Sequence, residues 1–319
     1  MRQWDVVVVG AGPAGLSAAL VLGRACRRVL VCDTGVPRSW ASKRMHAFLT
    51  RDGIAPAAFR RHAHRELQRY PKVVFRDSEV KRAVRIRKGG FRLATSRGVV
   101  TCRKLLIATG VLDHLPSIPG IVDYFGKSVF TCPYCDGWEV GGRALVAYGK
   151  GQRGLEMARA LTAWTDDIAL CTDGAAGLGS AARAALRANG IKLYEQKITG
   201  LEGRAGRLAA IVFKDGSRLR RTTLFFDMPS SGQSGLAKSL GCQFTRKGGV
   251  KSGRYEATSV PGVFVAGNII RDVQLAIVAA AEGASAAFGI NLSLTREDFE
   301  RKATGVRRIK HPPVNAPRP

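Results

Sequence analysis

The amino-acid sequence predicts an α/β protein that contains one dinucleotide-binding arrangement twice. Three observations lead to this prediction. A glycine-rich turn joins an apolar strand pattern to a helical pattern at residues 10–15, and the same order returns at residues 149–154. Between them lie Cys132 and Cys135, two thiols at the spacing of a redox dithiol that can close a small disulfide ring. A chain of 319 residues is long enough to bury a core in each of two domains.

The first copy of the arrangement is complete in every part. Residues 6–9 are apolar and β-branched, as in a strand that is buried on both faces. In the turn that follows, Gly10 makes the tight bend, Gly12 lets a pyrophosphate approach the backbone, and Gly15 lets the helix pack on the strand. The helix N-terminus favours the phosphates, and Asp33 at the end of the next strand accepts from a ribose hydroxyl. This order predicts a Rossmann-like site.

The second copy follows the cysteine pair. An apolar strand pattern at 144–148 leads to Gly149, Gly151 and Gly154, then to a helical pattern, another strand and Asp173. Two dinucleotide sites in one chain favour a flavin together with a nicotinamide cofactor. The sequence therefore predicts two Rossmann-like, three-layer domains, with the dithiol at the start of the second.

Other strands and helices fill the rest of both domains. Short runs rich in β-branched and aromatic residues predict strands, and longer periodic patterns predict helices. The segment 116–120 contains two prolines and a glycine and is typical of a linker. Further strands are expected at 73–75, 80–86, 91–95, 99–102, 105–110, 191–194, 208–213, 219–226 and 263–268, and further helices at 56–70, 155–164 and 274–292.

The chain is strongly basic, with 51 Lys and Arg against 24 Asp and Glu, a formal net charge of +27. The basic residues are spread along the sequence without a nucleic-acid-binding motif, so we expect no nucleic-acid partner. A solvated basic surface accounts for such a charge, and it would also suit an acidic protein that donates electrons. No apolar run suggests a membrane span, so we expect no membrane partner.

The chain has seven cysteines. Those outside the close pair stand in or beside apolar runs, which predicts buried, reduced thiols and a cytoplasmic location. They are Cys26, Cys32, Cys102, Cys171 and Cys242. His62 and His64 lie two positions apart and point to different sides of a helix. A zinc site at Cys132 and Cys135 lacks a second ligand pair at the required spacing, so we expect no metal.

Several motifs follow one another in an order that points to a family. They are Gly10 to Gly15, Ala108 to Gly110, Cys132 to Gly137, Gly149 to Gly154 with Glu156, and Pro261 to Asn268 followed by Gln274. In these motifs the chain resembles the low-molecular-weight thioredoxin reductases, over about residues 1–292. The resemblance implies FAD bound by a discontinuous domain, residues 1–114 and 250–319, and a pyridine-nucleotide-like domain, residues 115–249, that carries the dithiol. It also implies a homodimer.

The resemblance further implies roles for single residues. Cys135 would be the thiol nearer the flavin, Cys132 the thiol that exchanges with substrate, and Asp136 the acid that handles the proton. A proton carrier suits this chemistry because the thiolate is the reactive form of cysteine. FAD would be bound by Gly10, Gly12, Pro13, Ala14, Gly15, Asp33, Arg38, His46, Val80, Ala108, Thr109, Gly110, Gly267, Asn268, Gln274 and Leu275, and a nicotinamide by Gly149, Gly151, Gly154 and Asp173.

Some positions depart from the family pattern. Members that use NADPH have an arginine-rich run where this chain has Asp173, which would repel a 2′-phosphate, so NADH is favoured over NADPH. Asn268 stands where the family has aspartate and keeps a hydrogen-bonding oxygen, so FAD binding should survive. Residues 33–46 are more similar to thioredoxin-reductase-like dithiol oxidases.

Three interpretations of the electron path are therefore open. Electrons can pass from a nicotinamide through FAD to the dithiol and on to a thioredoxin-like protein or a small disulfide. A small dithiol can instead pass electrons to FAD and then to oxygen. A protein such as ferredoxin can also be the donor. Because family members alternate between two domain arrangements, the resemblance also predicts hinges near residues 110–120 and 248–249.

Overall fold

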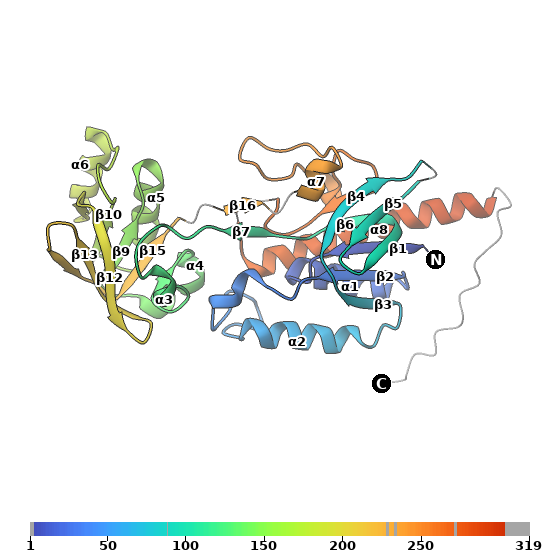
Figure 1. Ribbon diagram of the computed structural model, residues 1–319, viewed down its shortest axis with the longest axis horizontal. Coiled ribbons are helices and arrows are strands. Elements are labelled where there is room, and N and C mark those ends of the chain that lie inside the picture. The colour runs from blue at the N-terminus through green and yellow to red at the C-terminus, as the bar shows by residue number, and fades with distance from the viewer. Residues whose placement is uncertain (1–2, 88, 228–229, 233–234, 271–272, 304–319) are drawn as a thin grey trace.

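The computed structural model describes residues 3–303 except 88, 228–229, 233–234 and 271–272, so the end of the predicted first domain lies outside the described residues. The chain forms two lobes joined by a narrow connection (Figure 1). The first lobe holds the first glycine motif and the last helix. The other, which we call the dithiol lobe, holds Cys132, Cys135 and the second glycine motif. The predicted class of two Rossmann-like α/β domains is confirmed.

The first lobe is built on one seven-stranded sheet. Its strands are β1 (Trp4–Val9), β2 (Val29–Asp33), β3 (Val73–Asp77), β4 (Val80–Arg85), β5 (Phe91–Thr95), β6 (Gly98–Ile107) and β17 (Val263–Val265). Their order is β3-β2-β1-β6-β5-β4, with β17 also on β6. Val6 and Val8 pack into one apolar cluster and Val7 and Val9 into another, so β1 is buried on both faces. This burial explains the unbroken β-branched run.

Helices α1 (Pro13–Arg24) and α8 (Ala276–Ala303) pack together on one face of this sheet. A Cβ on Gly283 of α8 would lie 2.0 Å from the carbonyl oxygen of Ala14, so the two backbones touch there. By length and composition α8 is also apolar enough to cross a membrane, which the sequence analysis did not anticipate. However, Ala286, Ile290 and Leu294 are buried in the same cluster as α1, as in a core helix.

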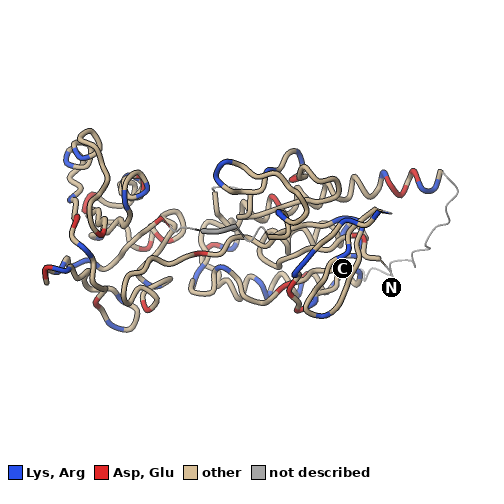
Figure 2. The backbone as a smooth tube through the Cα atoms, turned by 45° about the horizontal axis from the view of Figure 1, so that its top comes forward, with Lys and Arg blue, Asp and Glu red and all other residues tan. Residues whose placement is uncertain are grey.

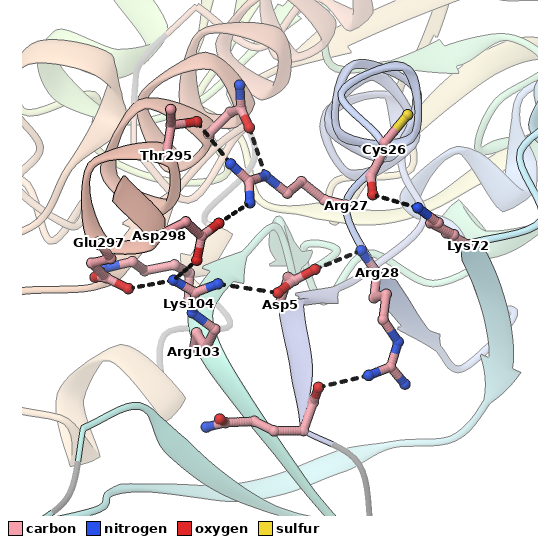
Figure 3. A network of polar contacts seen from close by, with 12 residues as sticks. Asp5, Cys26, Arg27, Arg28, Lys72, Arg103, Lys104, Thr295, Glu297 and Asp298 are labelled. Atoms are coloured by element: carbon pink, nitrogen blue, oxygen red, sulfur yellow. Dashed lines mark hydrogen bonds and ion pairs between the residues drawn. The ribbon is translucent and has the colours of Figure 1, made fainter. Parts of the chain in front are cut away.

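Charged side chains tie the end of α8 to the sheet (Figure 3). Arg103 of β6 pairs with Glu297 at 2.9 Å and with Asp298 at 2.8 Å, Lys104 pairs with Glu297 at 2.5 Å, and Arg27 pairs with Asp298 at 2.6 Å. Burial opposes ionisation of the two carboxyls, but these cations outweigh it and hold the pKa of Glu297 and Asp298 below the usual range. We call this group the α8 charge network.

The dithiol lobe has three layers. Its five-stranded parallel sheet has the order β11-β10-β9-β15-β8 and lies between helices and a three-stranded antiparallel sheet, β12-β13-β14. The strands are β8 (Val129–Phe130), β9 (Leu145–Tyr148), β10 (Ile168–Cys171), β11 (Lys192–Tyr194), β12 (Ile198–Arg204), β13 (Arg207–Phe213), β14 (Arg218–Arg220) and β15 (Thr223–Phe226). The helices are α3 (Ile121–Tyr124), α4 (Pro133–Asp136), η2 (Trp138–Val140), α5 (Gly151–Leu161) and α6 (Ser180–Ala188).

The connection between the lobes contains an antiparallel pair, β7 (Val111–Asp113) with β16 (Ser230–Gly232). After β16 the chain is already back in the first lobe, because Leu236, Ala237 and Cys242 pack into its core. The domain boundary predicted at residue 249 is therefore wrong, since the glycines at 248–249 form a turn within the first lobe. The remaining elements of this lobe are η1 (Arg38–Ala41), α2 (Pro56–Leu67), α7 (Gly235–Ser239) and η3 (Arg254–Glu256).

Other sequence expectations need smaller corrections. The two strands predicted at 99–102 and 105–110 are one strand, β6. Cys26 is exposed rather than buried, because it lies in the turn that ends α1, whereas Cys32, Cys102, Cys171 and Cys242 are buried as predicted. Lys and Arg occur along both lobes, as the sequence indicated (Figure 2).

Candidate active site

Cys132 and Cys135 form a disulfide in the dithiol lobe, with Cα atoms 5.2 Å apart. Helix α4 follows Cys132 directly, and Pro133 occupies its first turn, where the missing N–H costs nothing. The amides of Cys135 and Asp136 both donate to the carbonyl oxygen of Cys132, at 3.0 and 3.2 Å. This single turn brings the two sulfur atoms together.

The glycine after the motif determines where α4 lies. A Cβ on Gly137 would lie 2.4 Å from the carbonyl oxygen of Pro133 and 2.8 Å from the indole of Trp164. Trp164 also contacts the ring of Tyr134 edge-on, with ring centroids 5.4 Å apart. The turn that carries the disulfide therefore packs against this indole through a position that has room only for hydrogen.

Asp136 lies in a partly buried group of titratable side chains. Burial, together with the negative charge of Glu139, raises the pKa of Asp136 to about 6, although His46 acts in the opposite direction. His46 belongs to the first lobe, and its Nε2 lies 3.3 Å from Oε1 of Glu139. A carboxyl group with this pKa can take up and release a proton near neutral pH, as the opening and closing of a disulfide requires.

Two aromatic side chains are exposed beside the disulfide. Tyr134 is 73% exposed and Trp138 is 86% exposed. A cavity of about 320 Å³ borders the same turn and is lined by residues that include Tyr134, Gln152, Arg153 and Met157. Exposed aromatic groups next to a concave surface are typical of a place where a substrate or partner binds.

The first glycine motif has the backbone geometry that a dinucleotide site needs. Gly10 has a φ of +104°, and a Cβ there would lie 2.4 Å from the carbonyl oxygen of Ala108. A Cβ on Gly15 would lie 1.9 Å from the carbonyl oxygen of Gly10. At Gly12, in contrast, no atom of the described residues lies within 4 Å of a Cβ position. The turn is closed where helix and strand pack and open where a pyrophosphate would approach.

Asp33 is directed at this glycine turn. Its Oδ1 accepts a hydrogen bond from the amide of Ala11 at 2.9 Å, and its Oδ2 accepts one from Arg60 of α2 at 2.6 Å. Burial opposes ionisation of Asp33, but these contacts outweigh it and hold its pKa below the usual range. A cavity of about 720 Å³ opens beside Asp33, between residues 35–42 and α2. The sequence analysis did not identify Arg60, because no sequence motif relates it to Asp33.

Other residues predicted to bind FAD lie near the same turn. Ala108 and Thr109 at the end of β6 lie against Gly10, and a Cβ on Gly267 would lie 3.2 Å from that of Ala14. These small residues, the open position at Gly12 and the Asp33 carboxylate fit a bound FAD, which supplies two-electron chemistry. Gly110 and Asn268 lie next to these positions along the chain, Leu275 follows Gln274, and Val80 is buried at the start of β4.

Arg38 and Gln274, also predicted to bind FAD, are brought together. Arg38 donates to both carboxylate oxygens of Asp113, at 2.6 and 2.7 Å, and also bonds the side-chain oxygen of Gln274. Asp113 was not recognised from the sequence. His46 lies apart from this group and faces Glu139 of the dithiol lobe.

The second glycine motif repeats the close helix–strand contact of the first, but its middle glycine differs, because Gly151 has a φ of +56° and Gly12 a φ of −75°. A Cβ on Gly154 would lie 2.1 Å from the carbonyl oxygen of Gly149, so helix and strand pack as in the first lobe. However, the amide of Gly151 donates to the carbonyl oxygen of Ala176 at 2.7 Å. Ala176 is buried, and its own amide donates to Glu195 at 2.7 Å. In this conformation the protein itself occupies the amide that would meet a pyrophosphate.

Asp173 also differs from Asp33. Its Oδ1 accepts from the amide of Ile198 at 2.8 Å, and its Oδ2 accepts from Lys197 at 2.8 Å. Asp173 thus faces the start of β12, whereas Asp33 bonds its own glycine turn. These contacts do not favour the predicted role of Asp173 as the acceptor for a ribose hydroxyl. A nicotinamide dinucleotide therefore fits this motif less well than FAD fits the first one.

Comparisons with known proteins agree with this site. Residues 4–283 match the family model of the pyridine nucleotide-disulphide oxidoreductases. The chain is 34% identical to thioredoxin reductase tcpT of Claviceps purpurea, over 83% of this chain and 86% of that protein, and 29% identical to thioredoxin reductase sirT of Leptosphaeria maculans, over 94% and 97%. The crystal structure of HlmI superimposes with a TM-score of 0.91 at 35% identity, covering 95% of this chain and 96% of that one. The glycine turn at Gly10, the Cys132–Cys135 disulfide and these matches agree, and the chain belongs to the pyridine nucleotide-disulphide oxidoreductase family as a thioredoxin-reductase-like, flavin-dependent disulfide oxidoreductase.

Proposed function

We propose that electrons pass between FAD in the first lobe and the Cys132–Cys135 disulfide, and from there to or from a thioredoxin-like protein or a small dithiol or disulfide. The observation that carries this proposal is the position of the disulfide turn. Asp136, next to Cys135, lies within electrostatic reach of His46 from the first lobe. The dithiol is therefore on the side of its lobe that faces the FAD-binding lobe, as Figure 1 shows for α4.

The residues of this chain can carry out each exchange step. A thiolate of the substrate attacks the sulfur of Cys132, the disulfide breaks, and Cys135 leaves as a thiolate. The second thiol of the substrate then attacks the mixed disulfide, which releases oxidised substrate and reduced Cys132. Asp136 holds or supplies the proton that the thiolates exchange. The same steps in reverse reduce a disulfide substrate.

An anaerobic titration of the FAD-loaded protein tests the proposal. NADH, NADPH and dithiothreitol would each be added while the flavin absorbance band is followed. We expect dithiothreitol to bleach the band through the disulfide, and Cys135→Ser to abolish this bleaching. If neither nucleotides nor dithiols bleach the flavin, the proposed electron path is wrong.

Two candidate functions differ in the direction in which electrons flow through FAD. The first, predicted from the sequence, is a reductase that takes electrons from NADH rather than NADPH. The second is a dithiol oxidase that passes electrons from a small dithiol through FAD to oxygen. The bond between the Gly151 amide and the Ala176 carbonyl favours the second, because it occupies the first amide of α5, one of the amides that a pyrophosphate would meet there. Oxygen consumption with a small dithiol and no nucleotide would support the oxidase. Rapid bleaching by NADH would support the reductase.

The remaining predictions concern partners. An acidic electron-donor protein would suit the net charge of +27, and its reaction rate would fall with rising salt. The proposed homodimer and its cytoplasmic location rest on the family resemblance and the cysteine content. Sedimentation of the purified protein at two concentrations tests the dimer.

A further inference from the structure

A segment of the first lobe, residues 38–46, runs along the dithiol lobe. We call it the strap. It comprises η1 and the residues up to His46, and it precedes α2 in the chain. At its start Arg38 is held by both oxygens of Asp113 in β7, the strand that leads to the dithiol lobe. The strap is therefore anchored at the connection and extends from there.

The middle of the strap touches the dithiol lobe at backbone distance. Gly126 follows α3 and has a φ of +71°. A Cβ there would lie 2.4 Å from the carbonyl oxygen of Ala41 and 2.9 Å from its Cβ. Next to this contact the ring of Trp40 lies 6.2 Å from that of Phe125, measured between centroids. The strap can therefore pack against Gly126 only because this residue has no side chain.

The end of the strap makes a polar contact beside the disulfide turn. Nδ1 of His46 lies 3.4 Å from Asp52 in its own lobe, and Nε2 lies 3.3 Å from Glu139 in the dithiol lobe. Glu139 belongs to η2, which follows directly after Asp136 and Gly137. His46 therefore bridges the two lobes at the edge of the redox site.

We propose that the strap is a docking element that holds the dithiol lobe with Cys132–Cys135 turned towards the FAD-binding lobe. Gly126 accepts the strap sterically, and Glu139 is a positioning residue that holds its end through His46. The proposal rests on the proposed function, because it assigns this arrangement to electron exchange with FAD. Small contacts of this kind between domains allow relative motion, so the docking is reversible.

Two alanine substitutions test the steric contact with a matched control. Gly126→Ala and Gly142→Ala both place a Cβ on a residue with a φ of +71°, so both variants have the same backbone strain. At Gly142, however, nothing in the described part of the chain lies within 4 Å of that Cβ. Hydrogen exchange of the FAD-loaded protein would report on the amides of residues 38–46. We expect Gly126→Ala to speed their exchange by about tenfold or more, and Gly142→Ala to leave it unchanged. Equal exchange in both variants would overturn the proposal.

Glu139→Gln tests the polar contact. We expect the strap amides beside His46 to exchange faster, and anaerobic flavin reduction by dithiothreitol to slow by about two- to fivefold, the range for a partly exposed ion pair. Glu202→Gln is the control, because it removes an exposed ion pair between Glu202 of β12 and Arg218 of β14.

Hydrogen exchange can be measured without turnover, so it separates the docking from the electron path. If no dithiol reduces the flavin but Gly126→Ala still releases the strap, the electron path fails and the docking stands. Unchanged exchange near His46 in Glu139→Gln would contradict its positioning role.

Discussion

The amide of Gly151 donates a hydrogen bond to the carbonyl oxygen of Ala176 at 2.7 Å, and Gly151 is the middle glycine of the second motif, as Gly12 is of the first. Ala176 is held in turn by Glu195, which accepts from its amide, and Arg183 bonds both oxygens of Glu195 at 2.7 and 2.8 Å. A nicotinamide dinucleotide can reach the Gly151 amide only if this loop moves. We therefore expect this loop to weaken the binding of a nicotinamide dinucleotide at the second motif.

Glu195→Ala is expected to loosen this loop and to raise the affinity for NADH severalfold above a weak wild-type value. The reason is that the Ala176 amide loses its acceptor and Arg183 loses its partner, so the closed conformation is less favoured. Calorimetric titration with NADH measures the affinity. Hydrogen exchange at Gly151 measures the opening directly, and it should quicken in the same variant.

Glu202→Ala provides the control for that prediction. Glu202 also pairs with an arginine in the dithiol lobe, Arg218 at 3.0 Å, but the pair lies on β12 and β14, away from the glycine motif. Glu202→Ala should therefore leave both the affinity for NADH and the hydrogen-exchange rate of the Gly151 amide unchanged. If Glu195→Ala behaves like Glu202→Ala, the loop does not control access to this motif.

Gly137→Ala is expected to displace the disulfide turn. Its Cβ would meet the carbonyl oxygen of Pro133 at 2.4 Å and Trp164 at 2.8 Å, so α4 must shift, at a cost of about 1–3 kcal/mol. Urea unfolding measures the loss of stability, and the rate of flavin reduction by dithiothreitol should fall with it. Gly253 has a negative φ, and among the residues that the structure describes none has an atom within 4 Å of its Cβ position. Gly253→Ala should therefore change neither the stability nor the rate.

The sequence predicted the sheet of the first lobe well because each strand carries its own local pattern. The prediction failed inside β6, which was divided at Arg103 and Lys104. Two charged residues in a row are untypical of a buried strand. The carboxylates of Asp5, Glu297 and Asp298, all distant in the sequence, make them acceptable there. Local sequence patterns do not reveal ion-pair partners that are distant in the sequence and come together only on folding.

The same limit applies to the candidate site. The thiols and the glycine turns were found because they are contiguous motifs with fixed spacing. Arg60, Asp113 and Glu139 were missed because each acts on a residue from another element, namely Asp33, Arg38 and His46. The second glycine motif was expected to bind a nicotinamide because its spacing is intact. Its occupation by the Ala176 carbonyl depends on a loop conformation that spacing does not encode.

Arg103→Leu is expected to destabilise the protein by about 1–3 kcal/mol, because it removes the cation that Glu297 and Asp298 share in a half-buried place. Each carboxylate keeps one partner, Lys104 for Glu297 and Arg27 for Asp298. The pKa of both carboxyls is depressed in the folded state. Their contribution is therefore present above their usual pKa and is lost as the pH falls through the lower, folded value. Urea unfolding at pH 7 and at acid pH should show a smaller acid-linked loss in the variant. Arg97→Leu, at an exposed pair with Asp77, should match the wild type.

Asp136 should give the redox reaction a pH dependence centred near 6. Its carboxyl is protonated below the pKa of about 6 and ionised above it. When a dithiol reduces the disulfide and the flavin, the carboxylate accepts a proton, so the rate should rise through this pH and then level off. Anaerobic stopped-flow measurements of the flavin band between pH 4.5 and 8, a range chosen to span about one to two units on either side, would show the rise.

Asp136→Asn should remove that rise, and it should also change the stability profile in a way that needs no turnover. Because burial raises the pKa of Asp136 from 3.8 to about 6, the folded protein binds more protons than the unfolded chain between these values. The free energy of unfolding therefore falls as the pH rises from 3.8 to about 6, and it stays lower at higher pH. In Asp136→Asn this fall should disappear, so unfolding in urea at pH 5 and pH 8 should differ less than in the wild type. A rate profile that keeps its step near pH 6 in this variant would assign the proton to another group. Glu139, whose charge acts on Asp136, would be the next position to substitute.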